Sequence, residues 1–356
     1  MLAINGKWLG HSLTGTERYA TEVTKRIVAE MGCEVTVFVP KSASVPSWLD
    51  SARVIRSRFD GIVFEQFALP LLSLRYHLIN IGGPAPVLKM RQTVTLFDAS
   101  VFRFPETFTR SFVFFYQLMY KLVAHRAINL VTISDFSANE ISDVTKIDGR
   151  RFTVAPCGSN HFSGLTAVKP NFDVPEFFVV CVGTLAVRKN LVPVVSALVM
   201  ADIPTVVVGV AGISSVFRSG QVGLVMDELL TVPGRLRDEE IAWLYDRALA
   251  LVFPSVYEGF GLPIIEAQIR GCPVVCSSRP AMREVGRQSV EYFNPESPGD
   301  AVDLVLELQA NAVHREEFIR AGKENAARFD WDQTASDILR VAQANRPVSG
   351  DRRARR

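Results

Sequence analysis

Short apolar runs alternate with longer segments of helical periodicity along most of this sequence, and the alternation constrains the fold more than any other feature. The runs are four to eight residues long, which is typical of buried parallel strands joined by helices. We therefore predict an α/β fold. Strands are expected at residues 2–5, 34–40, 77–80, 92–98, 129–134 and 151–156, and then at 177–184, 205–209, 228–234, 250–255 and 273–278.

The chain has 356 residues, more than one hydrophobic core usually serves, so we expect two domains. The best linker is Ser159–Phe177, which contains two prolines and has no helical period. We predict an N-terminal domain at 1–165, a C-terminal domain at 166–332, a terminal amphipathic helix at 333–346 and a flexible basic tail at 347–356. Two open α/β domains that face each other bind ligands between the carboxyl ends of their strands.

The composition excludes several classes of protein. A net charge of +2 gives no argument for nucleic acid as a partner. The five cysteines are scattered without a CxxC pair, which predicts reduced and mostly buried thiols. The N-terminus lacks the apolar core of a signal peptide, and no uncharged apolar run reaches about 18 residues. We expect a cytoplasmic protein, or one lying peripherally on the cytoplasmic face of the inner membrane.

The segment PSVYEGFGLPIIEA, residues 254–267, follows an expected strand and holds two glutamates separated by seven residues. Pro263 suits the first turn of a helix, which places Glu266 in that turn and Glu258 on the loop before it. From the residues alone four interpretations stay open. The glutamates are a general acid and base, ligands of a metal, acceptors for sugar hydroxyls, or charges at an ordinary helix start.

Gly259 and Gly261 permit tight turns and a close approach of main-chain amides to a ligand. Such amides and a helix N-terminus favour an anion, while carboxylates accept bonds from vicinal hydroxyl groups. A second loop, after the strand at 177–184, carries Arg188 and Lys189, two cations placed to neutralise a diphosphate. A nucleotide sugar contains all of these groups. The alternative for each loop is a set of solvated charges.

Several spaced motifs resemble the family 4 (group 1) glycosyltransferases, which have the two-domain GT-B fold. GTLAVRKN (183–190) and VPGRLRDEEIAWLYDRALALVFPSVYEGFGLPIIEAQIRGCPVVCS (232–277) are similar to the family's C-terminal domain. The stretches similar to its N-terminal domain are GTERYATEV (15–23), FEQFALP (64–70), FRFPETF (102–108), VTISDFSANEI (131–141) and FTVAPCG (152–158), and FDWDQTASDIL (329–339) resembles its closing helix, which packs back on that domain.

The resemblance implies a retaining enzyme that moves a sugar from a nucleoside diphosphate sugar to an acceptor hydroxyl, usually without a metal or other cofactor. Glu258 matches the glutamate that lies against the donor sugar, and Glu266 the one that binds the ribose hydroxyls. Lys189, with Arg188 beside it, matches the basic site for the diphosphate, and Gly15 matches the glycine loop across the cleft.

The implied donor site also includes Thr184, Gly259, Phe260, Gly261 and Leu262. The amides of the last three are expected to stabilise the charge that develops on the leaving diphosphate. Because the leaving phosphate oxygen can itself accept the proton of the acceptor, no separate general base is required.

Two positions depart from the family pattern. Many members carry an arginine where this chain has Thr184, so Arg188 takes a larger share of the charge. Many also carry His-Asp where this chain has Phe97-Asp98, which leaves Asp98 as a candidate catalytic residue without the usual imidazole. Phe97 either packs in the core or stacks on a sugar.

Similarity to exopolysaccharide and O-antigen mannosyltransferases favours GDP-mannose as donor, with a UDP-hexose second, and a polyprenyl-diphosphate-linked glycan as acceptor. The segment 102–126 interleaves aromatic and basic residues, as a core helix or as one that contacts a membrane, and the arginines of the tail attract anionic lipid or only solubilise the chain. The competing classes are a glycosidase, a nucleotide sugar epimerase and a catalytically weak nucleotide-sugar-binding protein.

Overall fold

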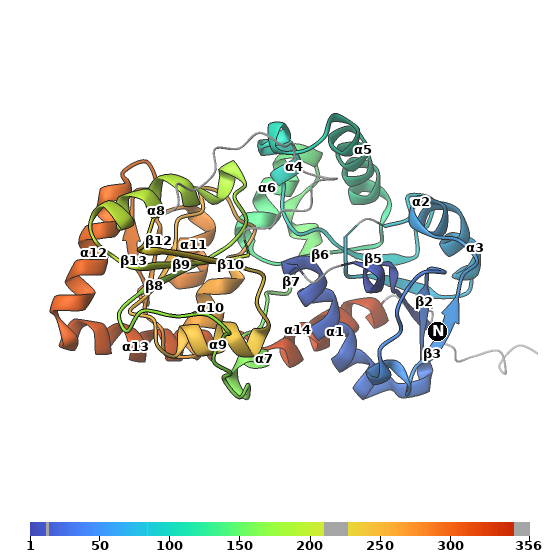
Figure 1. Ribbon diagram of the computed structural model, residues 1–356. Helices are drawn as coiled ribbons and strands as arrows, with labels where there is room; N and C mark the ends of the chain where they lie inside the picture. Colours follow the sequence, from blue (N-terminus) through green and yellow to red (C-terminus); the bar gives the residue numbers. More distant parts are fainter. Residues whose placement is uncertain (12–13, 84, 210–226, 345–356) are drawn as a thin grey trace, which may run out of the picture.

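The computed structural model describes residues 1–11, 14–83, 85–209 and 227–344, and it shows two α/β lobes side by side (Figure 1). The N-terminal lobe is built on a seven-stranded parallel sheet in the order β3-β2-β1-β4-β5-β6-β7. Its strands are β1 Leu2–Asn5, β2 Val35–Val39, β3 Arg53–Arg56, β4 His77–Asn80, β5 Gln92–Thr95, β6 Asn129–Thr132 and β7 Phe152–Val154.

The C-terminal lobe is built on a six-stranded parallel sheet in the order β10-β9-β8-β11-β12-β13. Its strands are β8 Val179–Val182, β9 Thr205–Val208, β10 Leu230–Gly234, β11 Leu251–Phe253, β12 Val274–Ser277 and β13 Glu291–Phe293. The strand order reverses between β8 and β11, and an analogous reversal separates β1 from β4. Loops at such a switch point leave the sheet in opposite directions and form a crevice at its carboxyl edge. The α/β class and the GT-B architecture are confirmed.

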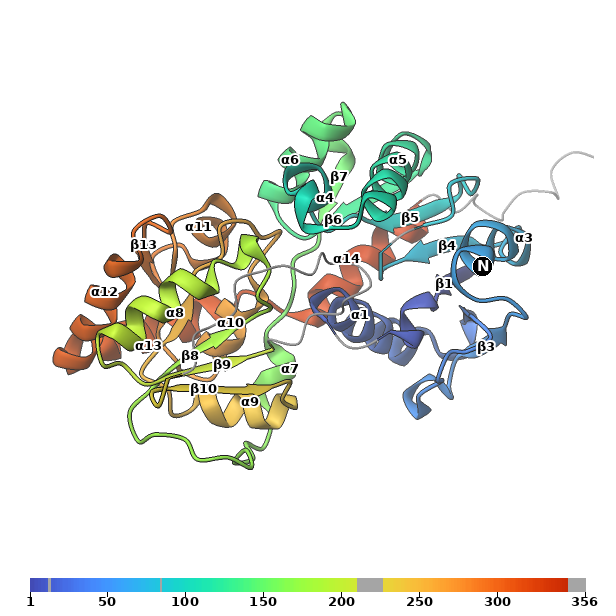
Figure 2. The same ribbon diagram turned by 45° about the horizontal axis from the view of Figure 1, so that its top comes forward.

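Helices cover both faces of the N-terminal sheet. One face carries α1 (Gly15–Met31) and α14 (Trp331–Ala344), which pack together through Tyr19 and Trp331 with ring centroids 5.5 Å apart. The other face carries α2 Gly61–Val63, a π-helical turn η4 Phe64–Ala68, α3 Leu69–Leu72, α4 Ser100–Arg103, α5 Arg110–Arg126 and α6 Asp135–Thr145. Figure 2 shows α14 running from the side of the C-terminal lobe onto the N-terminal lobe, where it lies against α1.

The C-terminal sheet is likewise enclosed. One buried cluster lies between the sheet and the helices α8 (Leu191–Met200) and α12 (Pro298–Ala310). A second cluster lies between the opposite face of the sheet and the helices there. The remaining helices are α7 Asn160–Ser163, α9 Asp238–Tyr245, α10 Leu262–Ile269, α11 Pro280–Gly286 and α13 Ala312–Ala326. Short 3-10 turns occupy Lys7–Gly10, Gly32–Glu34, Ser47–Leu49, Pro105–Thr107, Gly149–Arg151 and Val187–Lys189. No helix within the described residues is long and apolar enough to cross a bilayer.

Three expectations need correction or extension. The edge strands β3 and β13 were not predicted, because RVIR and EYF are short, partly exposed and interrupted by charge, so neither forms an apolar run. The linker Ser159–Phe177 is not wholly irregular, since it contains α7. The terminal helix begins at Trp331, two residues before its expected start, and its predicted last residues and the basic tail lie outside the described residues.

The prediction of buried thiols is confirmed for four of the five cysteines, all of which are free; Cys33 is exposed. Burial raises the pKa of Cys181 and of Cys272 to about 12. These thiols are therefore protonated and unreactive at neutral pH.

Candidate active site

Three of the predicted site residues form one cluster of charges, which we call the Glu258 cluster: Glu258, Lys189 and Arg188. The Lys189 ammonium donates a short hydrogen bond to Glu258 Oε1, and Arg188 Nη1 lies 3.5 Å from Glu258 Oε2. The side chains are only 12 to 16% exposed. A buried carboxylate between two cations is stabilised by both of them, and removing one cation destabilises the fold because a buried charge is left without its partner.

The topology explains why residues 70 positions apart meet. Arg188 and Lys189 close the 3-10 turn after β8, and Glu258 lies on the loop after β11, the strand beside β8 in the sheet. The Val256 amide donates to the Arg188 carbonyl at 2.8 Å, which fastens one loop to the other. The cluster therefore sits at the switch point of the C-terminal sheet, where α/β proteins bind ligands.

Glu258 and Lys189 each stabilise the charged form of the other, which burial disfavours. Burial raises the pKa of the Glu258 carboxyl, but Lys189 and Arg188 outweigh it and hold that pKa below its usual value. Burial also lowers the pKa of the Lys189 ammonium; Glu258 opposes that shift, and Asp98 of the other lobe is close enough to oppose it as well. Asp98 thus belongs to the electrostatic surroundings of the cluster, and its catalytic role stays a prediction.

Gly259 brings the glutamate loop against the N-terminal lobe. A Cβ on this residue would lie 2.9 Å from the Phe97 carbonyl oxygen and 3.0 Å from Asp98 Cβ, so only glycine fits. The Gly259 carbonyl accepts hydrogen bonds from the hydroxyls of Ser134 and Ser137 at the start of α6. The loop is therefore fixed from both lobes, and the roles of these two serines were not found from the sequence.

The helix after the loop begins one residue earlier than expected. Gly261 has a φ of +102° and is the N-cap, so α10 starts at Leu262 with Pro263 in its second position. Glu266 is consequently the fifth residue of the helix. The prediction that it lies in the first turn is wrong.

Glu266 instead points to a histidine that the sequence reasoning missed. His161 Nε2 lies 3.1 Å from Glu266 Oε1, and the indole N–H of Trp331 donates to His161 Nδ1 at 3.0 Å. Because an indole nitrogen only donates, His161 Nδ1 accepts, and the proton of the neutral imidazole is on Nε2 and is donated to Glu266. No local spacing signals this relation, since the three residues come from α7, α10 and α14.

Phe97 packs in the core rather than standing free at the cleft. Its ring meets Tyr19 edge-on with centroids 5.3 Å apart, and it lies against the main cluster of buried side chains. Asp98 beside it accepts a hydrogen bond from the Ser100 amide at 2.8 Å, which opens α4. Phe97, at the position where many family members carry histidine, thus contributes apolar packing against Tyr19 of α1.

The other donor-site candidates lie at the ends of elements that face the crevice. Thr184 follows β8, and Gly15 is the first residue of α1, with open space beside its Cα. One turn after Gly15, Arg18 forms an ion pair with Asp238 of α9 in the other lobe. Of the backbone candidates, Phe260 has a buried ring that packs edge-on against Phe329, so only its main chain can face a ligand.

Within the described residues no group of three or more histidine, cysteine, aspartate or glutamate side chains is arranged to hold a metal ion. The metal-free reaction expected from the resemblance stays a prediction.

Comparisons with known proteins agree with this geometry. The family profile of the glycosyl transferases group 1 matches residues 166–325, which contain the Glu258 cluster and Glu266. The chain is 25% identical over 372 residues to the O-antigen chain mannosyltransferase B of Escherichia coli, covering 92% of this chain and 96% of that relative.

Solved structures resemble the whole chain at low identity. Sucrose-phosphate synthase from Thermosynechococcus elongatus superposes with a TM-score of 0.73 at 18% identity, over 96% of this chain and 98% of that one. HepE from Anabaena, solved with UDP and glucose, gives a TM-score of 0.68 at 12% identity, over 95% and 98% of the two chains. These likenesses establish the two-domain GT-B fold.

The protein thus has two α/β lobes in the GT-B arrangement, with a cluster of charged groups at the switch point of the second lobe. Residues 166–325 form a domain of the glycosyl transferases group 1 type, and the protein is a glycosyltransferase.

Proposed function

We propose that the protein is a retaining glycosyltransferase that moves a hexosyl group from a nucleoside diphosphate sugar to a glycan acceptor during assembly of a cell-surface polysaccharide. The observation that supports this most is the Glu258 cluster, where two cations and one carboxylate meet at the switch point of a group 1 domain. A diphosphate is the ligand class that two convergent cations favour.

In this proposal the donor changes the partners of the Glu258 cluster. Without donor, Glu258 neutralises Lys189 and Arg188. When the diphosphate takes over both cations, the carboxylate becomes available to accept hydrogen bonds from hydroxyls of the sugar. As the bond to the anomeric carbon breaks, negative charge grows on the diphosphate, and the cations and the amides of Phe260, Gly261 and Leu262 stabilise it.

We assign mannose as the transferred sugar and GDP-mannose as the donor, because a relative that matches nearly the full length of this chain is named a mannosyltransferase. The acceptor in this assignment is a polyprenyl-diphosphate-linked glycan. A UDP-hexose is the second candidate, supported by the UDP and glucose bound in the HepE structure. The proposal places Glu266 on the ribose, close to the linker that carries His161.

Ligand-induced stabilisation tests the donor. GDP, UDP, GDP-mannose and UDP-glucose are added separately, and the shift of the thermal unfolding midpoint is measured. A ligand present at a hundred times its dissociation constant stabilises the fold by about 2.7 kcal/mol. GDP and GDP-mannose are expected to give the largest shifts. If only the uridine compounds stabilise the protein, the guanosine assignment is wrong; if a donor binds without any turnover, the protein is the catalytically weak binder.

Substitutions test the roles of the residues. Glu258→Ala is expected to lower kcat by at least about a hundredfold, as loss of one transition-state contact does. Glu266→Ala is expected to weaken mainly nucleotide binding, and Lys189→Ala to weaken nucleoside diphosphate binding by about ten- to a hundredfold. Full activity in both glutamate variants, or unchanged diphosphate affinity without Lys189, contradicts the assignment. Retention is checked from the anomeric configuration of the product by NMR.

A further inference from the structure

Large apolar side chains are exposed mainly in one part of the N-terminal lobe. Of the 19 large hydrophobic residues that are exposed within the described chain, 13 lie between residues 59 and 128. Isolated exposed leucines are common, but contiguous apolar surface marks a binding site for a protein or a membrane. The gathering of exposed apolar side chains between residues 59 and 128 therefore calls for a binding partner.

The first of these surfaces is the outer side of α2, η4 and α3, a helical segment from Gly61 to Leu72. Its inner side packs in the core through Phe64 and Leu69, as expected for a helix on a sheet. Its exposed residues are also apolar, with Phe67 62% and Leu71 69% exposed, and Ile62, Val63, Leu72 and Leu74 in or next to the segment are exposed as well. A surface helix of a soluble protein ordinarily has polar residues there.

The second surface is the outer side of α5. Phe114, Leu118 and Leu122 recur every four residues and are 72%, 46% and 38% exposed, so they form an apolar stripe along the helix. The inner side of the helix, with Met119 and Val123, is buried in a separate core. The sequence left open whether this helix is core or membrane-facing, and the structure shows one buried face and one exposed apolar face.

The two helical segments lie on the same side of the N-terminal sheet. Leu78 of β4 packs with α3 and pairs in register with Gln92 of β5, which points to the same face as Val94, a residue in the core under α5. Figures 1 and 2 likewise place both segments on the side of the sheet away from α1 and α14. Their outer faces therefore belong to one surface, which we call the α3–α5 surface.

The charge of this surface has one dominant sign. Exposed cations border the apolar stripes, namely Arg58, Arg75, Arg110, Lys121 and Arg126. Between residues 58 and 128 of the described chain the exposed carboxylates are Asp60 and Glu106, and Asp60 is held by Ser42. Long basic side chains beside exposed aromatic and aliphatic residues are the composition that binds an anionic lipid surface.

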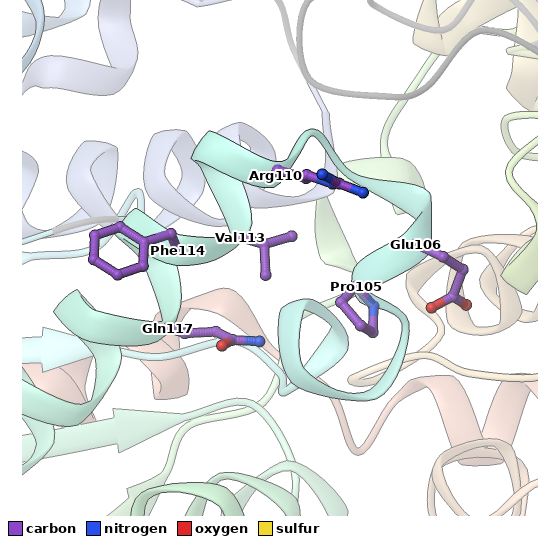
Figure 3. A pocket seen from close by; sticks show the side chains of 6 residues that line it. All are labelled: Pro105, Glu106, Arg110, Val113, Phe114 and Gln117. Atoms are coloured by element: carbon purple, nitrogen blue, oxygen red, sulfur yellow. The ribbon is translucent and has the colours of Figure 1, made fainter.

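A pocket of 440 Å³ lies at the amino end of α5, where the stripe begins. Glu106, Arg110, Val113 and Phe114 line its wall (Figure 3). The side chain of Gln117, another wall residue, donates to the Val101 carbonyl of α4, the short helix that follows Asp98. The pocket thus lies beside α4, the helix that follows Asp98.

We propose that the α3–α5 surface docks the enzyme on an anionic lipid bilayer, with the apolar stripes in the headgroup region and the bordering cations on the lipid phosphates. This inference does not depend on the donor or on the transfer reaction. If the proposed lipid-linked acceptor is correct, docking on this surface brings the membrane to the edge of the lobe nearest the active site.

Binding to vesicles tests the proposal with the full chain. The protein is cosedimented with vesicles of phosphatidylcholine alone and of phosphatidylcholine mixed equally with phosphatidylglycerol. We expect binding to the mixed vesicles, weakened by salt, and at least tenfold weaker binding to phosphatidylcholine. Each cation near an anionic surface contributes about 1 kcal/mol, or about fivefold in affinity.

Two variants remove the surface without touching the active site. The double substitution Phe114→Ser and Leu118→Ser is expected to lower vesicle binding at least tenfold, and Arg75→Glu with Lys121→Glu to lower it at least as much. Met200→Ser with Val313→Ser is the matched control, because these residues are 86% and 72% exposed on the other lobe, and its binding should not change. All of these positions are exposed, so circular dichroism and the unfolding midpoint should match the parent protein.

Several outcomes overturn the proposal. Absence of binding to either vesicle does so, as does an equal loss in the control variant. Binding that survives both surface variants but is lost when residues 347–356 are removed assigns the membrane contact to the basic tail. If light scattering shows a dimer that Phe114→Ser with Leu118→Ser converts to a monomer, the surface is an interface between two copies of the chain and not a lipid site.

Discussion

Replacing His161 by asparagine and by glutamine separates the two hydrogen bonds that its imidazole makes. An asparagine amide reaches the position of Nδ1 and can still accept from Trp331, but it leaves Glu266 without its donor. A glutamine amide reaches the position of Nε2 and still donates to Glu266, but it leaves the Trp331 N–H without an acceptor. The two variants therefore break opposite halves of the same chain.

The magnitudes follow from the burial and charge of the two bonds. The side chains of His161 and Glu266 are 5% and 11% exposed, so the bond to the carboxylate is a largely dry, charge-assisted one. Losing it costs about 1.5 to 3 kcal/mol, while losing the neutral indole bond costs about 1 kcal/mol. If Glu266 holds the ribose, a carboxylate that is no longer oriented loses much of that contact. We then expect nucleoside diphosphate affinity to fall by about tenfold or more in His161→Asn and only about two- to fivefold in His161→Gln.

The assay pairs nucleoside diphosphate affinity from calorimetry with the free energy of unfolding from denaturant titration. His314→Asn is the control, because His314 Nε2 lies 2.7 Å from Glu291 Oε1 in a comparable pair on α13 and β13. This control should lose stability without losing affinity. Equal affinity in the two His161 variants, or an affinity loss in the control as large as in His161→Asn, would show that His161 has only a structural role.

Three further outcomes are expected. Gly259→Ala should lower turnover by at least about tenfold with a smaller change in stability, since its Cβ meets the fixed Phe97 carbonyl and displaces the loop; unchanged kinetics would contradict the close packing. A thiol reagent should label Cys33 alone in the native protein and all five cysteines after unfolding, and rapid labelling of a second thiol would contradict the burial. Burial raises the pKa of Glu22, but a hydrogen bond from Arg26 and the charge of Lys25 outweigh burial, so the pKa in the folded protein lies below its usual value. The stabilisation by Glu22 is therefore complete above about pH 4.3 and is lost as the pH falls through the lowered pKa of the folded state. The gap in denaturation midpoint between Glu22→Gln and the parent should therefore be present at pH 7 and narrow below about pH 4; a gap that persists in acid would be due to packing.

The sequence predicts most of the fold because the central strands of a parallel sheet are buried on both faces and appear as apolar runs. Eleven runs led to strands, including the edge strands β7 and β10. The two unpredicted strands, β3 and β13, also lie at sheet edges, but they are only four and three residues long and contain charged residues, so they form no apolar run. The sequence could not show which sides of α3 and α5 are exposed, and here the cause is that apolar residues lie on every side. A helix that is apolar on both sides has no polar stripe to show which side is buried.

The site divides in the same way. Glu258 and Lys189 were each predicted from their own loops, and the structure adds that they bind each other, which depends on β8 and β11 being neighbours in the sheet. His161 was not predicted because its partners are separated from it by whole elements and are joined only in the folded protein. Gly259 was expected to help the backbone approach a ligand, and the contact that demands glycine is with the opposite lobe.

The position of α14 has a consequence for how the N-terminal lobe is completed. Its buried residues, including Trp331, Ile338 and Leu339, cover the same face of the first sheet as α1, yet they follow the whole C-terminal lobe in the sequence. During synthesis the first sheet therefore emerges with part of its apolar face open, and it stays open until the second lobe has been made. A fragment that ends in the linker would carry this exposed face permanently. The lobe that appears first on the ribosome can therefore complete its packing only after the second lobe has been synthesised.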